Sequence, residues 1–281
     1  MSDSSFLQPE EWPFSRIAGY GVLNACPLGG GLSNRCWRLV LHSSSSSDLQ
    51  AVWRPVSAAS QAFGVDRQQE YQLLSAIHPC PFAPHPIAKT PDGILVEWIE
   101  GAVCTHSPSP ATLMALQANI HRLPLPGWRL AVRQRAERYL AAISPEDKGK
   151  DLVSVCSHFF SHIPQSGFPD TCCHHDLGFY NLIQRPGGEL AVIDWEYAAA
   201  GDPMLDLALT VQANQLDVTT AAQHYCRYLG ADPELVSEAV QQWLPWCDFL
   251  AMLWYYAGAN LWQDETYRIE AKALLTKLAV A

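Results

Sequence analysis

The order of strand-like and helix-like segments constrains the fold of this chain more than any other feature of its sequence. In the part before Gly101, a pair of β-prone runs comes first, then a helix-like segment, then a second pair of β-prone runs. The runs span 36–41, 49–54, 87–88 and 94–98, and the helix-like segment spans 68–77. This order predicts a small β-rich lobe that carries one helix.

After Gly101 the hydrophobic pattern becomes helical. Amphipathic segments lie at 111–122, 129–143, 151–162, 217–229 and from 232 to the end. The last one begins with Asp232-Pro233-Glu234, which combines an N-cap acid with proline at the first helical position. We therefore predict an α+β fold with an N-terminal segment at 1–19, a β-rich N-lobe at 20–98 and a larger helical C-lobe at 99–281.

Composition limits the classes of protein and partner. The chain has 281 residues, 48% of them hydrophobic, with 10 tryptophans, so it can bury a sizeable core. Its formal net charge of -10 argues against nucleic-acid binding and leaves room for a cationic partner. The polar first residues predict no signal peptide, and the lack of a long apolar run predicts no membrane span. We therefore expect a cytoplasmic protein.

The 9 cysteines are scattered without the paired spacing of a disulfide framework, which favours a reduced protein. Cys172-Cys173-His174-His175 places potential zinc ligands in a row. Adjacent side chains on an extended segment point to opposite faces, so they do not converge on one ion. We therefore do not expect a structural metal at this tetrapeptide.

The segment from His174 to Glu196 carries the strongest chemical signal. Asp176 and Asn181 stand in a His-x-Asp-x4-Asn pattern, and Asp194 follows next to apolar, strand-like runs. Phosphoryl transfer needs one carboxylate that accepts a proton from the attacking hydroxyl, and an asparagine and a second carboxylate that hold Mg²⁺ on the phosphates. The spacing therefore predicts Asp176 as the catalytic base and Asn181 and Asp194 as metal ligands.

A glycine-rich stretch, Gly29-Gly30-Gly31-Leu32-Ser33-Asn34, lies directly before a β-prone run. Backbone N–H groups in such a turn can approach phosphate oxygens closely. An ordinary β-turn explains the stretch about as well on its own, but its place ahead of the strands and the helix favours phosphate binding. We predict that Gly30, Gly31, Ser33 and Asn34 contact a nucleotide.

Two further places in the predicted N-lobe are candidate nucleotide contacts. Arg54, at the end of a β-prone run, can supply the cation that holds phosphates, and Glu70 on the following helix can pair with it. The plain alternative is that Arg54 is one more surface arginine. At the junction of the lobes, backbone groups of Glu97, Trp98 and Ile99 can hydrogen-bond an adenine edge, unless the segment is only the end of a strand.

Acids and histidines near the motif are predicted to support the chemistry rather than perform it. Asp202 precedes a proline and suits the N-cap of a helix, and Asp206 is placed to brace the catalytic loop. We expect His174 and His175 to orient this loop, and we assign no role to His121.

The predicted C-terminal helix is rich in tryptophan and tyrosine, whose ring faces can hold a cation. Most of these rings are expected to pack in the core, because aromatic stripes at helical spacing usually do. Asp248 and Trp254 are the residues of this helix that we predict to face a substrate.

Together these motifs resemble those of the aminoglycoside phosphotransferase and choline kinase superfamily. The residues that carry the resemblance are His174-His175-Asp176-x4-Asn181, Ile193-Asp194-Trp195-Glu196-Tyr197 and Gly201-Asp202-Pro203-x2-Asp206-Leu207-Ala208. The Asp-Trp-Glu-Tyr form is similar to the choline-kinase and thiamine-kinase branch. The likeness to bacterial thiamine kinases is carried further by the segments at 29–34, 52–55, 127–129 and 243–246.

The resemblance implies a protein-kinase-like bilobal fold, ATP and Mg²⁺ as cofactors, and phosphoryl transfer to a small cationic alcohol. It implies the roles already predicted for Asp176, Asn181 and Asp194, and we place Glu196 and Trp195 near the substrate. Position 54 departs from the superfamily, which usually has lysine there. Arginine keeps the charge but offers a planar fork in place of a compact ammonium.

The sequence therefore predicts an ATP-dependent kinase that phosphorylates the hydroxyl of thiamine. Choline, ethanolamine or an aminoglycoside is the alternative acceptor. A catalytically inactive protein that binds a nucleotide is the alternative from a different class.

Overall fold

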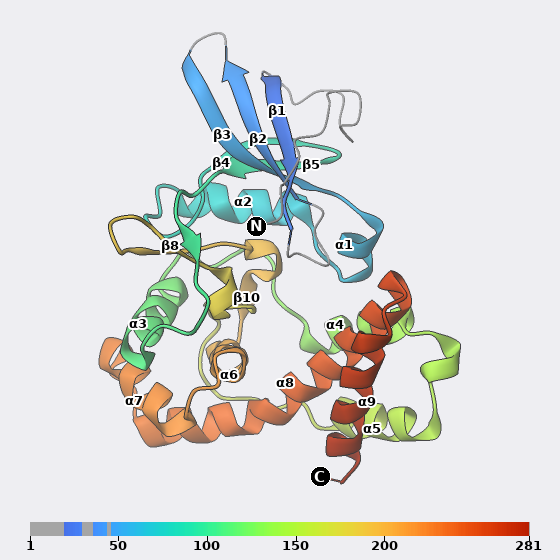
Figure 1. Cartoon of the computed structure of the whole chain (residues 1–281). Helices are drawn as coiled ribbons and strands as arrows, with labels where there is room; N and C mark the ends of the chain where they lie inside the picture. The colour runs from blue at the N-terminus through green and yellow to red at the C-terminus, as the bar shows by residue number, and fades with distance from the viewer. Residues whose placement is uncertain (1–19, 30–35, 44–45, 281) are drawn as a thin grey trace. The chain divides into compact units, whose positions relative to one another are not determined.

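The computed structural model describes residues 20–29, 36–43 and 46–280, which form two compact units (Figure 1). The first unit comprises the described residues up to Gln61, Val65–Val103 and Leu182–Glu196. The second unit comprises Ala62–Gly64, Cys104–Asn181 and the described residues from Tyr197 onward. The predicted α+β class, β-rich in its N-terminal part and helical in its C-terminal part, is confirmed. The division at 1–19, 20–98 and 99–281 stays a prediction.

A five-stranded antiparallel sheet with strand order β1-β2-β3-β5-β4 forms most of the first unit. Its strands are β1 (Gly21–Pro27), β2 (Trp37–Ser43), β3 (Ser46–Pro55), β4 (Pro86–Thr90) and β5 (Gly93–Glu97). In β2, Trp37, Leu39 and Leu41 are buried in the core of the sheet, whereas Arg38 and Val40 between them are only half-buried. This alternation is the period of two that a strand requires.

The helix α2 (Arg67–Ile77) packs against β4 and β5 (Figure 1). It follows the short helix α1 (Ala58–Ala62) and begins after Asp66. The Asp66 carboxylate accepts hydrogen bonds from the N–H groups of Gln68, at 2.8 Å, and Gln69, at 3.2 Å. This cap satisfies donors that the first turn leaves open and fixes where the helix starts.

A second, smaller sheet in the first unit draws in a segment from late in the sequence. It has the order β6-β8-β9 and consists of β6 (Ala102–Val103), β8 (Leu182–Gln184) and β9 (Leu190–Val192). The N–H of Val192 also donates to the carbonyl of Phe82 at 2.6 Å. These pairings explain why the segment Leu182–Glu196, which includes Asp194, belongs to the first unit.

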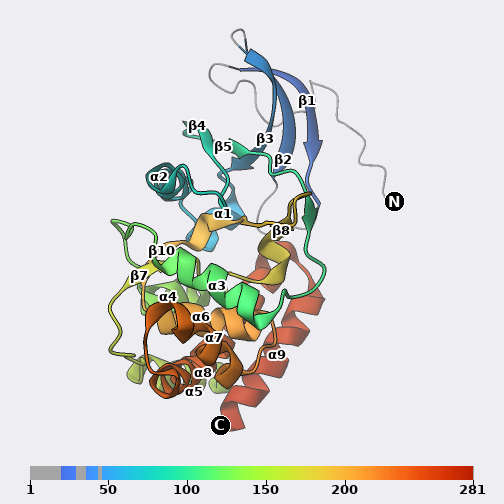
Figure 2. The same ribbon diagram turned by 90° about the vertical axis from the view of Figure 1, so that its left-hand side faces the viewer.

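Helices dominate the second unit (Figure 2). They are α3 (Pro110–His121), α4 (Val132–Ala142), α5 (Lys150–Ser161), α6 (Pro203–Ala213), α7 (Val218–Leu229), α8 (Pro233–Trp262) and α9 (Glu265–Val280). The long helix α8 packs against α4, α6, α7 and α9, and α3 packs on α7. Within the part of the chain that the structure describes, no helix has both the length and the apolar character needed to cross a membrane.

The predicted helix starts at Asp202 and Asp232 are confirmed. Asp202 caps α6 by accepting from the N–H of Met204 at 2.8 Å, and Asp232 caps α8 by accepting from the N–H of Glu234 at 2.9 Å. The segment predicted as helical from 232 to the end forms α8 and α9. They are separated at Gln263, whose left-handed φ of 55° ends α8.

Two short strands of the second unit, β7 (Thr171–Cys173) and β10 (Ala199–Gly201), pair antiparallel. Cys172 and Cys173 on β7 are fully buried. The strand leads directly into His174, so the pairing fixes the start of the loop that carries the predicted catalytic aspartate.

Candidate active site

In the first unit, Arg54 and Glu70 form the ion pair that the sequence predicted between a strand and the following helix. Arg54 lies at the end of β3 and Glu70 in the first turn of α2. Arg54 Nε is 2.8 Å from Glu70 Oε1, and both side chains are almost entirely buried. Burial makes this pair more than a surface contact, because a buried carboxylate needs a cation beside it.

A second buried arginine, Arg67, extends this pair into a ring. Its Nη1 lies 2.5 Å from Glu70 Oε2 and 2.9 Å from Glu196 Oε2. Glu196 Oε2 also lies 3.0 Å from Arg54 Nη2. The four side chains therefore alternate in charge around a closed ring, which we call the charge ring. The sequence reasoning missed Arg67, although its position three residues before Glu70 on one helix was an available signal.

Asp194 joins this ring from the outside. Its carboxylate pairs with Arg54 Nη2, and its side chain is 24% exposed, against 2% for each acid of the ring. Asp194 has a φ of 66°, a left-handed value that aspartate tolerates better than most residues. The next residue, Trp195, is buried and donates from Nε1 to the carbonyl of Val192 at 2.9 Å, which fixes the turn after β9. The substrate contact predicted for Trp195 stays a prediction.

The charges of the ring shift the ionisation of its members. Burial alone would lower the pKa of the Arg54 guanidinium, but the charges of Glu70, Asp194 and Glu196 outweigh it and raise that pKa well above its usual value. Burial, with the charge of Asp194 nearby, raises the pKa of Glu196 to about 8 in spite of the two arginines. Arg54 therefore stays a cation within the ring.

The segment Glu97–Ile99, predicted to receive adenine, follows the sheet in the first unit. The N–H of Glu97 donates to the carbonyl of His85 at 2.8 Å, and that of Trp98 donates to the carbonyl of Gln50 at 3.3 Å. The contact of Glu97, Trp98 and Ile99 with adenine stays a prediction. Gly30, Gly31, Ser33 and Asn34, the other predicted nucleotide contacts, lie outside the described residues.

In the second unit, the predicted base and one predicted metal ligand lie in contact. Asp176 Oδ1 accepts a hydrogen bond from the hydroxyl of Tyr180 at 2.8 Å. Asp176 Oδ2 accepts from Asn181 Nδ2 at 3.0 Å, and the Asp176 carbonyl accepts from the same nitrogen at 2.9 Å. The amide oxygen of Asn181 and the carboxylate of Asp194 are both oxygen donors of the type that Mg²⁺ prefers, so the residue types fit the predicted metal.

The predicted brace of the catalytic loop by Asp206 is confirmed. Asp206 is fully buried on α6, and its carboxylate accepts from the backbone N–H groups of His174, at 3.0 Å, and His175, at 2.6 Å. Two side chains of α3 also reach Oδ2: Gln117 Nε2 at 2.7 Å and His121 Nε2 at 2.9 Å. Burial would raise the pKa of Asp206, but the hydrogen bond from His121 and the surrounding histidines hold it well below its usual range.

His121 is the supporting residue that the sequence reasoning missed. Its Nδ1 lies 2.5 Å from the hydroxyl of Tyr225 on α7. When His121 donates from Nε2 to Asp206, its Nδ1 is free to accept a hydrogen bond from the Tyr225 hydroxyl. No local motif marks His121 in the sequence, because its partners come from α6 and α7.

His175 is buried against the backbone of β10. Its φ of 62° is left-handed, and its Nδ1 donates to the carbonyl of Tyr197 at 3.1 Å. A Cβ at Gly201 would lie 2.8 Å from His175 Nε2, so only glycine fits beside the ring. Burial lowers the pKa of His175 to about 4. The predicted orienting role agrees with a ring that stays neutral at pH 7.

The buried His175 predicts acid sensitivity of the fold. Its folded pKa of about 4 lies below the ordinary value of 6.5, so the unfolded chain takes up the proton first as the pH falls. The stabilisation is complete above pH 6.5 and is lost as the pH approaches 4. Between pH 7 and pH 5 we expect the free energy of unfolding, measured with urea, to lose about 2 kcal/mol through this residue.

The control for this pH effect is a variant that cannot titrate. His175→Asn keeps a residue that tolerates left-handed φ, and its unfolding free energy should fall less between pH 7 and pH 5 than that of the parent protein. His106→Asn, at an exposed position, should retain the full pH dependence. Equal slopes for His175→Asn and the parent protein would contradict the assignment.

Asp248 and Trp254 of α8 have partners within the second unit. Asp248 Oδ1 accepts from Gln212 Nε2 at 2.5 Å, and its Oδ2 lies 2.7 Å from Lys277 Nζ on α9. The Trp254 ring packs in an aromatic cluster whose other members include Phe63, Trp262 and Tyr267. These contacts agree with the packing expected for most aromatic residues of this helix, and the substrate contacts predicted for Asp248 and Trp254 stay predictions.

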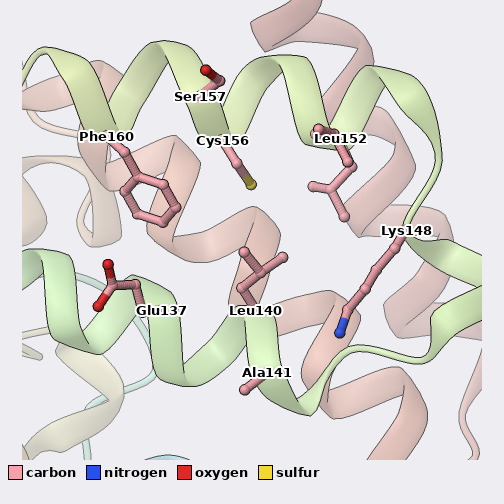
Figure 3. A pocket seen from close by; sticks show the side chains of 9 residues that line it. Glu137, Leu140, Ala141, Lys148, Leu152, Cys156, Ser157 and Phe160 are labelled. Atoms are coloured by element: carbon pink, nitrogen blue, oxygen red, sulfur yellow. The ribbon is translucent and has the colours of Figure 1, made fainter.

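The second unit also contains a cavity of about 590 Å³ between α4 and α5 (Figure 3). Leu140 of α4 faces Cys156 and Leu152 of α5 across it, with Phe160 at one end and Lys148 at the other. Its lining is mostly apolar and includes none of the predicted site residues. The cavity is therefore separate from the predicted catalytic loop.

Comparisons with known proteins agree with this chemistry. The sequence model of the Phosphotransferase enzyme family (APH) matches residues 24–239. The thiamine kinases of Shigella boydii serotype 4 and of Escherichia coli K12 are each 29% identical over 187 residues, which cover 66% of this chain and 68% of each relative.

A solved structure, the choline kinase LicA from Streptococcus pneumoniae, superposes with a TM-score of 0.72 at 20% identity, over 92% of this chain and 94% of LicA. A second LicA structure is a complex with AMP, with a TM-score of 0.68 at 19% identity over 94% of each chain. These likenesses confirm the predicted kinase-like fold.

Proposed function

The chain belongs to the Phosphotransferase enzyme family and is a kinase that acts on an alcohol, and from this premise we propose that it transfers the γ-phosphoryl group of ATP to the hydroxyl of thiamine. The observation that carries the proposal is the contact of Asp176 with Asn181 in the His-x-Asp-x4-Asn loop. The similarity to thiamine kinases favours thiamine as the acceptor. The AMP complex of LicA supports an adenine nucleotide as the donor.

In the proposed reaction, Asp176 accepts the proton of the attacking hydroxyl. A carboxylate suits this task because it can take up a proton, and the two oxygens of Asp176 are held in place by Tyr180 and Asn181. The brace from Asp206 fixes the backbone just before the base, so the carboxylate does not have to be ordered during the reaction.

Other residues would neutralise the charge of the phosphates. Arg54 neutralises part of the charge on the phosphates, and Asn181 and Asp194 would hold Mg²⁺. When bound, the metal supplies charge neutralisation on the transferred group. The net charge of -10 favours a cationic acceptor, in agreement with the thiazolium ring of thiamine.

The test is an assay of ADP release with Mg·ATP and one acceptor at a time: thiamine, choline, ethanolamine or kanamycin. We expect saturable turnover with thiamine, above the background of a reaction without acceptor. Turnover with choline, ethanolamine or kanamycin but not with thiamine would keep the phosphotransferase activity and reject the proposed substrate. Nucleotide binding without turnover on any acceptor would favour the inactive nucleotide-binding alternative.

A further inference from the structure

The charge ring encloses the guanidinium of Arg54 between buried acids and a second arginine. We propose that Arg67 and Glu196 are positioning residues that hold the Arg54 guanidinium in its phosphate-binding orientation, and that their presence makes arginine the required residue at position 54. This inference rests on the proposed function, because it gives Arg54 a phosphate to bind.

The contacts of Arg54 use the shape of the guanidinium. Nε meets Glu70 Oε1 at 2.8 Å, whereas Nη2 meets Glu196 Oε2 at 3.0 Å. These are different nitrogens of one rigid planar group, so acids against two of its nitrogens restrict the rotation of the guanidinium. A lysine offers a single nitrogen at the end of a flexible stem, and it has no plane to fix.

Arg67 holds both of these acids from the other side. Its Nη1 contacts Glu70 Oε2 at 2.5 Å and Glu196 Oε2 at 2.9 Å, and its Nε donates to the carbonyl of Pro55 at 3.3 Å. Pro55 is the next residue after Arg54 in the chain. Arg67 thus ties α2, the end of β3 and the segment after β9 together around the Arg54 side chain.

The arrangement of the ring explains how two arginines can be buried together. Guanidinium groups and glutamates alternate, so each buried guanidinium lies beside two acids. The third nitrogen of Arg54, Nη1, meets the Cys36 thiol at 4.0 Å, which is a weak contact that a phosphate oxygen can replace. The ring therefore holds two nitrogens of Arg54 and presents the third.

The ring predicts a particular pattern among variants. Arg67→Lys keeps one charge but cannot reproduce the fork, so the dissociation constant of ADP and the KM for ATP should rise about tenfold. The KM for thiamine should change less than the KM for ATP, because Arg67 is not among the residues predicted to contact the acceptor. A purely structural role of Arg67 would instead lower the amount of folded protein and leave the ADP affinity of the folded fraction unchanged.

The sharper test is a rescue. Arg54→Lys should weaken ADP binding about tenfold or more, because a single ammonium cannot meet both Glu70 and Glu196 as the guanidinium does. Glu196→Gln alone should also weaken binding, yet added to Arg54→Lys it should recover part of the loss, since a neutral amide does not require the guanidinium as its partner. If Arg54 and Glu196 acted independently, the losses of ADP binding free energy in the two single variants would add in the double variant.

The measurements are titration calorimetry with ADP, steady-state kinetics and thermal unfolding of each variant. Arg133→Lys, at an exposed arginine of α4 that pairs with Glu137, is the control and should match the parent protein. Unchanged ADP binding in Arg67→Lys, or additive losses in Arg54→Lys/Glu196→Gln, would overturn the inference while the proposed function stands. A parent protein that binds no ADP would overturn the proposed function and the inference with it. Should Arg67→Lys fail to fold, the rescue decides alone.

Discussion

An Asp176→Asn variant should lose about a thousandfold in kcat and still bind ADP as tightly as the parent protein. The amide is nearly the same shape as the carboxylate, so it keeps an oxygen that can accept from the hydroxyl of Tyr180. It cannot take the proton of the attacking hydroxyl, because an amide is not a base at neutral pH. The expected result is thus a loss in kcat without a matching loss in nucleotide affinity.

Asp170→Asn is the matched control for this prediction. Asp170 lies just before β7 on the same segment, and its carboxylate pairs with Arg129 at 2.6 Å on the surface. It should change kcat by less than about twofold, since exposed ion pairs contribute little. If Asp176→Asn kept the turnover of the parent protein, another group would have to be the base.

Local features of the fold could be predicted from the sequence because their partners are near in the chain. Asp202 and Asp232 were placed as N-caps, and each accepts from an N–H two residues later. The helix predicted at 68–77 forms at Arg67–Ile77, and its cap, Asp66, also accepts from N–H groups only two and three residues later. Patterns over a few residues carry this information without any tertiary contact.

The candidate site could be predicted only in part. The pair of Arg54 and Glu70 followed from the order of strand and helix, and the structure confirms the contact. The other half of the charge ring was missed, because the hydrogen bond from Arg67 to Glu196 joins residues 129 positions apart. Nothing in the local sequence indicates that the segment after β9 meets α2; the ion pair of Arg67 with Glu196 joins them in three dimensions.

The catalytic loop shows the same limit. Asp206 was predicted to brace the loop from its place in the Gly-Asp-Pro motif, and it does. Its carboxylate also contacts Gln117 and His121 on α3, which are 89 and 85 positions away in the sequence. No motif in the sequence of α3 marks these two residues. A single sequence gives no sign that a histidine on α3 will meet an acid on α6.

The largest effect on stability is expected from Asp206→Ala. The carboxylate accepts from two backbone N–H groups of the loop, at His174 and His175, and from the side chains of Gln117 and His121. All these groups lie in the interior, where a donor without an acceptor keeps its full desolvation cost. We expect the free energy of unfolding, measured with urea at pH 7, to fall by about 4 kcal/mol. Turnover should fall as well, because the loop before Asp176 loses its anchor.

Two further variants separate the parts of this effect. Asp217→Ala removes an exposed aspartate that caps α7 by accepting from Thr220, and it should lower the free energy of unfolding much less than Asp206→Ala. Asp206→Asn keeps one acceptor oxygen but loses the charge. Its loss of unfolding free energy should therefore lie between those of Asp206→Ala and Asp217→Ala. The contradicting result is an Asp206→Ala variant that destabilises the protein no more than Asp217→Ala does. That result would mean that the pairing of β7 with β10 holds the catalytic loop, and that the hydrogen bonds of Gln117 and His121 to Asp206 contribute little to stability.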